Sequence, residues 1–64
     1  MNIPGWIEVV QGWVYVTQVI AIEPMGVLRT RVKTASQDFE YIGTCSDFAR
    51  EMEKQLKNLY KNSN

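Results

Sequence analysis

Residues 6–22 read WIEVVQGWVYVTQVIAI, a run dominated by β-branched and aromatic side chains. Such side chains fit the pleated surface of a strand, and Gln11-Gly12 interrupts them where a two-residue hairpin turn would lie. The run therefore predicts two antiparallel strands, Trp6–Val10 and Trp13–Thr17.

The position of that turn decides which side chains share a face of the hairpin. Four aliphatic side chains gather on one face in two facing pairs. The pairs are Val9 with Val14 and Ile7 with Val16. The opposite face carries Trp6, Glu8, Val10, Trp13 and Tyr15.

Three further strands follow along the chain. Gln18–Glu23 predicts the first of them, and Glu23-Pro24-Met25-Gly26 fits a turn because proline presets the backbone at its second position. Val27–Thr34 then alternates between polar and apolar side chains with the period of two that strands show. Residues 35–37 predict a turn into a last strand, 38–44.

The last hairpin has a register that separates charge from apolar surface. A turn about Ser36-Gln37 sets Lys33 opposite Glu40 and Val32 opposite Tyr41. One face becomes charged and the other apolar, which supports this register.

The sequence changes to a helical period near residue 46. Ser46 or Thr44 can serve as the N-cap, and Asp47 in the first turn complements the helix dipole. An apolar stripe follows at helical spacing. It consists of Phe48, Met52, Leu56, Leu59 and Tyr60. On another face, Glu53 and Lys57 are spaced for a favourable ion pair.

These segments predict a single α+β domain spanning residues 1–64. Residues 1–5 form a leader, 6–44 an antiparallel sheet of four to five strands, 46–60 one C-terminal helix packed on one face, and 61–64 a frayed tail. The size is near the lower limit for a fold without disulfides or metal, so little of the apolar surface can be spare.

The predicted sheet has apolar side chains on both faces, but one helix can cover only one of them. The simplest registers predict a core of Val19, Ala21, Leu28, Val32, Phe39 and Tyr41. Ile20, Ile22, Val27 and Ile42 then fall on the other face. Either the first hairpin folds over that face or a second molecule covers it. We therefore take Trp13, Ile20, Ile22, Val27 and Ile42 as candidate interface residues.

A basic stripe offers an alternative function. Arg29, Arg31 and Lys33 could contact phosphates while Tyr15 or Trp13 stacks on bases. Against this, Glu40 is expected opposite Lys33, and seven basic residues balance seven acidic ones. The balanced charge gives no long-range attraction to nucleic acid or to anionic membranes.

The composition also bears on chemistry and location. The chain has no histidine and one cysteine, Cys45, so it lacks an internal disulfide and the usual zinc ligands. No pair of acidic residues is spaced for general acid and base catalysis. We expect a cytoplasmic protein that is not an enzyme, uses no cofactor and does not enter a membrane.

One family shows a similar order of residue classes. Residues 7–23, with their glycine turn, and the strand-then-helix ending from Phe39 to Leu56 resemble the small flagellar protein family called FlbD or SwrD. The resemblance implies an intracellular accessory protein that acts through protein contacts.

The expected function is thus a non-enzymatic protein-interaction module that self-associates through surplus apolar sheet surface. Two alternatives stay open. One is a weak nucleic-acid binder that uses the basic stripe, and the other is an inhibitor or accessory subunit of a larger protein.

Overall fold

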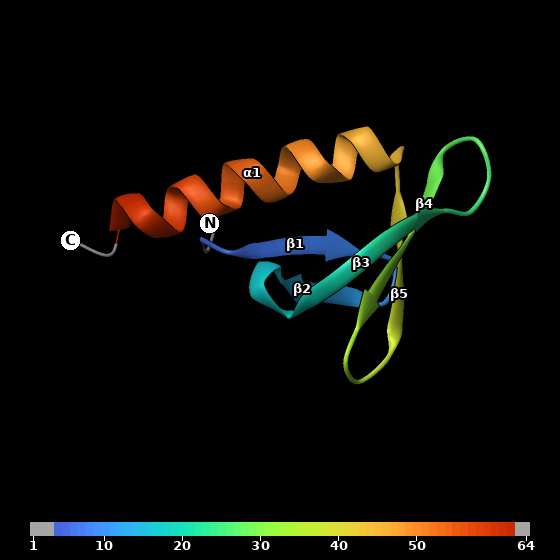
Figure 1. The fold of residues 1–64 in the computed structure, drawn as a ribbon, viewed down its shortest axis with the longest axis horizontal. Helices are drawn as coiled ribbons and strands as arrows, with labels where there is room; N and C mark the ends of the chain where they lie inside the picture. The colour runs from blue at the N-terminus through green and yellow to red at the C-terminus, as the bar shows by residue number, and fades with distance from the viewer. Residues whose placement is uncertain (1–3, 63–64) are drawn as a thin grey trace.

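A computed structural model describes residues 4–62 and shows an α+β fold, as the sequence predicts (Figure 1). The elements are β1 (Trp6–Val9), β2 (Gly12–Tyr15), a short 3-10 helix η1 (Val16–Gln18), β3 (Val19–Pro24), β4 (Arg29–Thr34), β5 (Asp38–Ile42) and α1 (Cys45–Asn62). The strands form two antiparallel sheets, β1–β2 and β3–β4–β5, where the sequence suggests one.

The first hairpin turns at Val10-Gln11, one residue earlier than expected. Ile7 pairs with Val14 and not with Val16, so the expected register is wrong by two residues. Two residues are one full period of a strand, and each side chain therefore keeps its expected face. Ile7, Val9 and Val14 share one face of the hairpin, and Val16 follows in η1; all four are buried.

The hairpin of β4 and β5 shows the same displacement. Lys33 pairs with Asp38 and not with Glu40, and Val32 pairs with Phe39. The Thr34 side chain holds the turn, because its hydroxyl lies 2.6 Å from the carbonyl oxygen of residue 37 and accepts a bond from the backbone N–H of the same residue at 3.2 Å. Here too the shift of two residues leaves the charged and apolar faces as expected.

Strand β3 departs from the expected alternation. It carries an irregularity at Ile20, which is an extra residue between two of its pairings with β4. Such a bulge reverses which face the following side chains occupy. Ile22 lies opposite the fully buried Val32 and packs against the core, whereas Ala21 is exposed. The expected places of Ala21 and Ile22 are therefore wrong.

The loop between β3 and β4 consists of residues 25–28, whereas the expected strands leave only residues 24–26 between them. It runs through Leu28, and the backbone N–H of Met25 donates to the carbonyl oxygen of Arg29 at 2.9 Å to close it. Leu28 is 61% exposed, so its expected place in the core is wrong.

The core lies between the two sheets and the helix. Its buried apolar residues are Ile7, Val9, Val14, Val16, Val32 and Phe48. Half-buried apolar residues surround them: Val19, Ile22, Phe39, Tyr41, Met52, Leu56 and Leu59. The hairpin β1–β2 thus covers the inner face of the three-stranded sheet, on the same side as α1. It does not cover the outer face.

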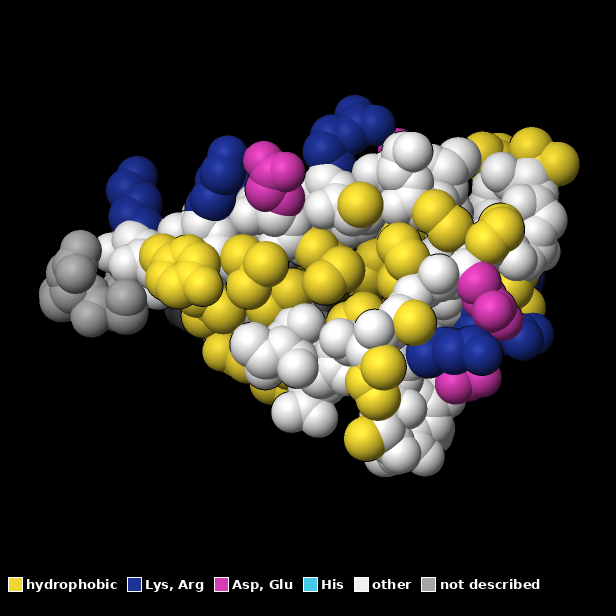
Figure 2. Space-filling view, in the orientation of Figure 1, with side chains coloured by type: hydrophobic (Ala, Val, Ile, Leu, Met, Phe, Trp, Pro, Cys, Tyr) yellow, Lys and Arg dark blue, Asp and Glu magenta, His cyan; other side chains and the backbone are white. Residues whose placement is uncertain are grey.

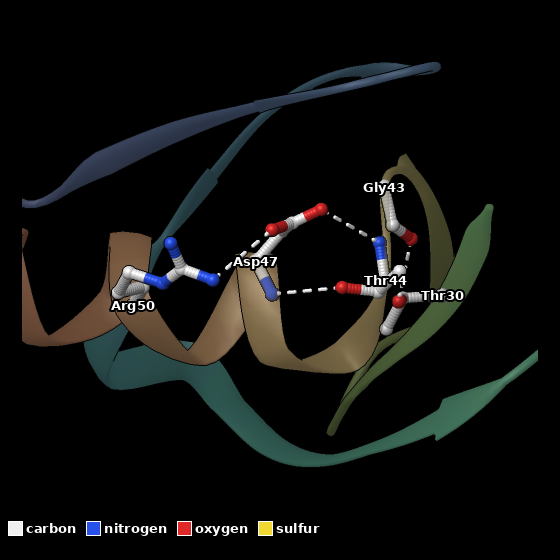
Figure 3. Close-up of polar contacts among 5 residues, drawn as sticks. All are labelled: Thr30, Gly43, Thr44, Asp47 and Arg50. Atoms are coloured by element: carbon white, nitrogen blue, oxygen red, sulfur yellow. Dashed lines mark hydrogen bonds and ion pairs between the residues drawn. The ribbon is translucent and has the colours of Figure 1, made fainter.

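Helix α1 begins with a reciprocal cap (Figure 3). The backbone N–H of Asp47 donates to Thr44 Oγ1 at 3.1 Å, and the backbone N–H of Thr44 donates to Asp47 Oδ2 at 3.2 Å. This pairing satisfies two backbone donors at the helix start. Of the two caps that the sequence allows, Thr44 is the one used, and the helix begins at Cys45.

The ends of the domain differ from their expected roles. The expected leader includes Gly5, which is buried, donates from its backbone to Gln55 Oε1 at 3.0 Å and accepts a bond from Val16 at 2.7 Å. The helix extends to Asn62, beyond the expected residue 60. Residues 1–3 of the leader and 63–64 of the tail lie outside the described residues.

The apolar stripe of the helix faces the core through Phe48, Met52, Leu56 and Leu59. The expected place of Tyr60 in that stripe is wrong, because Tyr60 is 74% exposed, and the polar Gln55 is buried instead. Glu53 and Lys57 form the expected ion pair at 3.1 Å. Within residues 4–62, no helix has the length and apolar character needed to cross a membrane.

Candidate functional site

The basic stripe lies on the outer face of the three-stranded sheet, where acidic side chains pair with it. Arg29 forms an ion pair with Glu40, and Arg31 contacts Glu23 at 2.9 Å. Lys33 also lies 3.7 Å from that glutamate. A stripe whose charges are paired within the chain attracts phosphate less strongly than free cations would.

The aromatic partners proposed for that stripe lie on the β1–β2 hairpin. Tyr15 packs edge-to-face on Trp6, with ring centroids 5.1 Å apart. Trp13 and Tyr15 line a small cleft of about 150 Å³ with Thr34 and Ser36, beside the β4–β5 turn. The cleft is lined by uncharged side chains, and the basic residues of the stripe do not line it.

The five candidate interface residues do not form one surface. Ile22 packs against the core, and Ile20 lies at the bulge of the edge strand β3. Trp13 belongs to the exposed outer side of the first hairpin. Only Val27 and Ile42 lie at the same end of the three-stranded sheet.

That end carries an exposed apolar surface, which we call the loop-end patch. It consists of Met25, Val27, Leu28 and Ile42, all exposed. Leu28 accepts a backbone bond from Gly43 at 2.9 Å, so the loop and the end of β5 are joined beside Ile42. The loop projects from the right of the molecule, and hydrophobic side chains cover its tip (Figures 1 and 2).

A cavity of about 480 Å³ lies in the corner between β1, β5 and α1. Its lining comes from residues 7–10, from Tyr41 and Ile42 of β5, and from Glu51 of α1. A second hollow of about 620 Å³ shares Tyr41 and Glu51 and continues along the charged side of the helix. We call the first of these the corner cavity.

Tyr41 stands between the two hollows and is held from two sides. Its ring packs edge-to-face on Phe48 at 4.9 Å between centroids. Gly43, with φ +147°, leaves room for the ring, because a Cβ at that position would lie 2.7 Å from Tyr41 Cε2. Burial, and after it the carboxylates of Glu51 and Asp47, raise the pKa of the Tyr41 hydroxyl above its ordinary value.

Cys45 is half-buried at the start of α1. Its sulfur lies 3.7 Å from the hydroxyl of Thr30, which also lies 3.0 Å from the carbonyl oxygen of Gly43 (Figure 3 shows the contact with Gly43). The surroundings are those of a packed thiol. Among residues 4–62, no group of three or more acidic or cysteine side chains is placed to hold a metal ion.

Sequence reasoning singled out Val27 and Ile42 but missed Met25, Leu28 and the corner cavity. The sequence predicts a turn at residues 23–26 and a strand from Val27, which places Leu28 in the sheet, whereas the observed strand begins at Arg29. The cavity arises where two sheets meet, and residues from distant parts of the chain line it. No local pattern in the sequence signals such a site.

Comparisons of the chain with models of known protein families, with curated proteins and with solved structures find no match. The resemblance to the FlbD or SwrD family stays a prediction.

Proposed function

We propose that this protein is a protein-interaction module that self-associates through the loop-end patch. The observation that carries this proposal is the exposure of its aliphatic side chains, which reaches 89% for Val27 and 60% for Ile42. A group of exposed apolar side chains at one end of a sheet, next to charged groups, is typical of an interaction site in a soluble protein.

The size of the patch suits weak association. Burying an aliphatic side chain fully is worth about 1.5–3 kcal/mol. In a two-fold dimer both copies contribute their patches, and this gain has to exceed an association cost of about 4–15 kcal/mol. The expected outcome is a reversible dimer whose population depends on concentration.

The charges beside the patch are compatible with a second copy as the partner. Ile42 lies opposite Arg29 on the outer face, and Arg29 is paired with Glu40. A two-fold contact therefore brings together both signs of charge from each copy. Because Arg29 is already paired with Glu40 inside each copy, the repulsion between like charges of the two copies is weaker than it would be for unpaired cations.

The proposal also includes that the protein binds a partner rather than catalysing a reaction, and that it acts in the cytoplasm. What supports it is the free thiol of Cys45, which suits a reducing compartment and packs against Thr30 rather than against a base.

Light scattering after size-exclusion chromatography, across a dilution series, tests the self-association. The natural chain should change from dimer to monomer on dilution, and Val27→Asp should be monomeric at all concentrations. Ile20→Asp is the matched control, because it places the same charge at an exposed aliphatic position outside the patch. A natural chain that stays monomeric at the highest concentration would contradict the proposal.

A further inference from the structure

The corner cavity exists because β1 and β5 meet at one point and then separate. The backbone N–H of Val10 donates to the carbonyl oxygen of Glu40 at 2.8 Å, and the backbone N–H of Glu40 donates to Gln11 Oε1 at 3.0 Å. No ladder joins the two strands in the part of the chain that the structure describes. Beyond Val10 and Glu40, the space between the strands is the cavity.

The backbone of two residues is directed into this opening. Along a paired strand, alternate residues direct their N–H and C=O groups to opposite neighbours. Val10 and Glu40 bond across the opening. Glu8 of β1 lies two residues from Val10, and Ile42 of β5 lies two residues from Glu40, so their backbone N–H and C=O groups point to the same side as those of Val10 and Glu40. Within residues 4–62, neither backbone has a hydrogen-bond partner on that side.

The side chains around the opening combine apolar walls with negative charge. Val10 and Ile42, which are both exposed, supply the aliphatic lining, and the nearly fully buried Ile7 and Val9 border it. Glu8 and Glu51 bring two carboxylates, and no lysine or arginine lines the cavity. Neither carboxylate has an ion-pair partner in the described chain, although Glu51 accepts a bond from Gln55 at 3.1 Å.

We propose that the opening between β1 and β5 binds an extended segment of a partner protein that carries a lysine or arginine. The backbone of the segment pairs with Glu8 and Ile42, as in the addition of a strand to an open sheet edge. The negative charge of Glu8 and Glu51 attracts its cationic side chain, and its aliphatic neighbours contact Val10 and Ile42. A volume of about 480 Å³ suits a few residues of such a segment.

The two carboxylates are the reason for assigning a cationic segment as the occupant. A partner with an acidic side chain at this position would place like charges together, which is costly in a partly desolvated site. Strand β3, at the opposite edge of the three-stranded sheet, is a poorer site for strand addition, because it carries a bulge and ends in Pro24.

This binding is separate from the proposed dimer, although Ile42 borders both surfaces. Glu8 and Glu51 belong to the cavity alone, and Val27 and Leu28 belong to the loop-end patch alone. The test is therefore carried out on the natural chain and on Val27→Asp, so that failure of the dimer and failure of the opening are distinguished.

The probe is an acetylated and amidated pentapeptide with a central lysine between two valines and a threonine at each end. It is titrated into isotopically labelled protein and followed by nuclear magnetic resonance. The expected result is a saturable shift of the Glu8 and Ile42 backbone amides. A second peptide, methylated on alternate backbone nitrogens, should bind at least several-fold more weakly, because it cannot pair along the strand.

Charge variants complete the experiment. Glu51→Gln and Glu8→Gln should each weaken binding on the order of tenfold, which is the usual effect of losing one charge-assisted contact. Asp38→Asn removes the same charge at the distant end of β5 and should bind as the natural chain does. Absence of saturable shifts at millimolar peptide would overturn the inference. Equal binding of a central-glutamate peptide, or shifts confined to other surfaces, would do the same.

Discussion

At the scale of single residues, Tyr41 joins strand β5 to helix α1. Its ring packs on Phe48 and over Gly43, while its hydroxyl lies near the acidic side chains of α1. The raised pKa of this hydroxyl means that the folded chain favours its neutral form. The unfolded chain ionises first as the pH rises, because its tyrosine keeps a pKa near the ordinary value of 10.0.

Alkaline pH should therefore destabilise the natural chain through Tyr41. Below about pH 9 both states carry a neutral hydroxyl, and stability is unaffected by this group. Above pH 10 the unfolded state binds fewer protons than the folded state, so the free energy of unfolding falls until the folded hydroxyl also ionises.

Urea unfolding of the natural chain and of Tyr41→Phe at pH 8, 9, 10 and 11 measures this effect. The phenylalanine keeps the ring contacts and removes the titration, so its stability should fall less between pH 9 and 11. The two proteins should behave in parallel from pH 8 to 9, which serves as the control. Parallel behaviour up to pH 11 would refute the role of Tyr41.

The faces of most residues could be predicted from the sequence, because strand periodicity fixes them. The pairing registers of the β1–β2 and β4–β5 hairpins are both shifted by two residues from those expected, so Val14 and Val32 are still buried as expected. Ile22 could not be placed, since a single extra residue at Ile20 reverses the alternation. Bulges carry no reliable signal in a run such as VIAI, where each side chain suits either face.

At the scale of the elements, the start of α1 depends on one reciprocal cap. Thr44→Ala removes the acceptor for the backbone N–H of Asp47 and should lower the free energy of unfolding by about 1 kcal/mol. In a domain of this size that corresponds to a fall in Tm of about 4–8 °C.

Thermal unfolding followed by circular dichroism measures this loss. Ser46→Ala is the matched control, because Ser46 is the other hydroxyl that the sequence offers as a cap and lies one residue inside the helix. It should leave the Tm nearly unchanged. A larger loss for Ser46→Ala than for Thr44→Ala would contradict the observed cap.

The kinds of element and their order could be predicted from the sequence, but their exact ends could not. The change from a period of two to a helical period marks the boundary near Thr44. The length of α1 and the division into two sheets depend on contacts between distant residues, such as the bond from Gly5 to Gln55. Local propensity does not report contacts of that kind.

At the scale of the whole molecule, every layer contributes to one small core. The candidate site shows the same dependence on distant parts of the chain. Ile42 could be recognised as exposed apolar surface, but the corner cavity requires β1, β5 and α1 to meet. A sequence pattern reports which side chains share an element, and not which elements leave an opening between them.

Because side chains from α1 and from both sheets share one core, we expect the helix and the first hairpin to unfold together. Phe48 is fully buried among side chains from both sheets, and Phe48→Ala should cost about 3–5 kcal/mol. A domain of this length has a total stability of about 3–10 kcal/mol, so the variant should lose about a third or more of it and should unfold at much lower urea than the natural chain.

Two probes report on different parts of the molecule in this test. Circular dichroism at 222 nm follows mainly the helix, and tryptophan emission follows Trp6 and Trp13 on the first hairpin. Both signals should be lost together in Phe48→Ala, and in the natural chain both should give the same urea midpoint. Ile20→Ala, at an exposed position of β3, should retain both signals. A Phe48→Ala chain that loses its helix signal but keeps native tryptophan emission would contradict the prediction, because it would show that the first hairpin folds without α1.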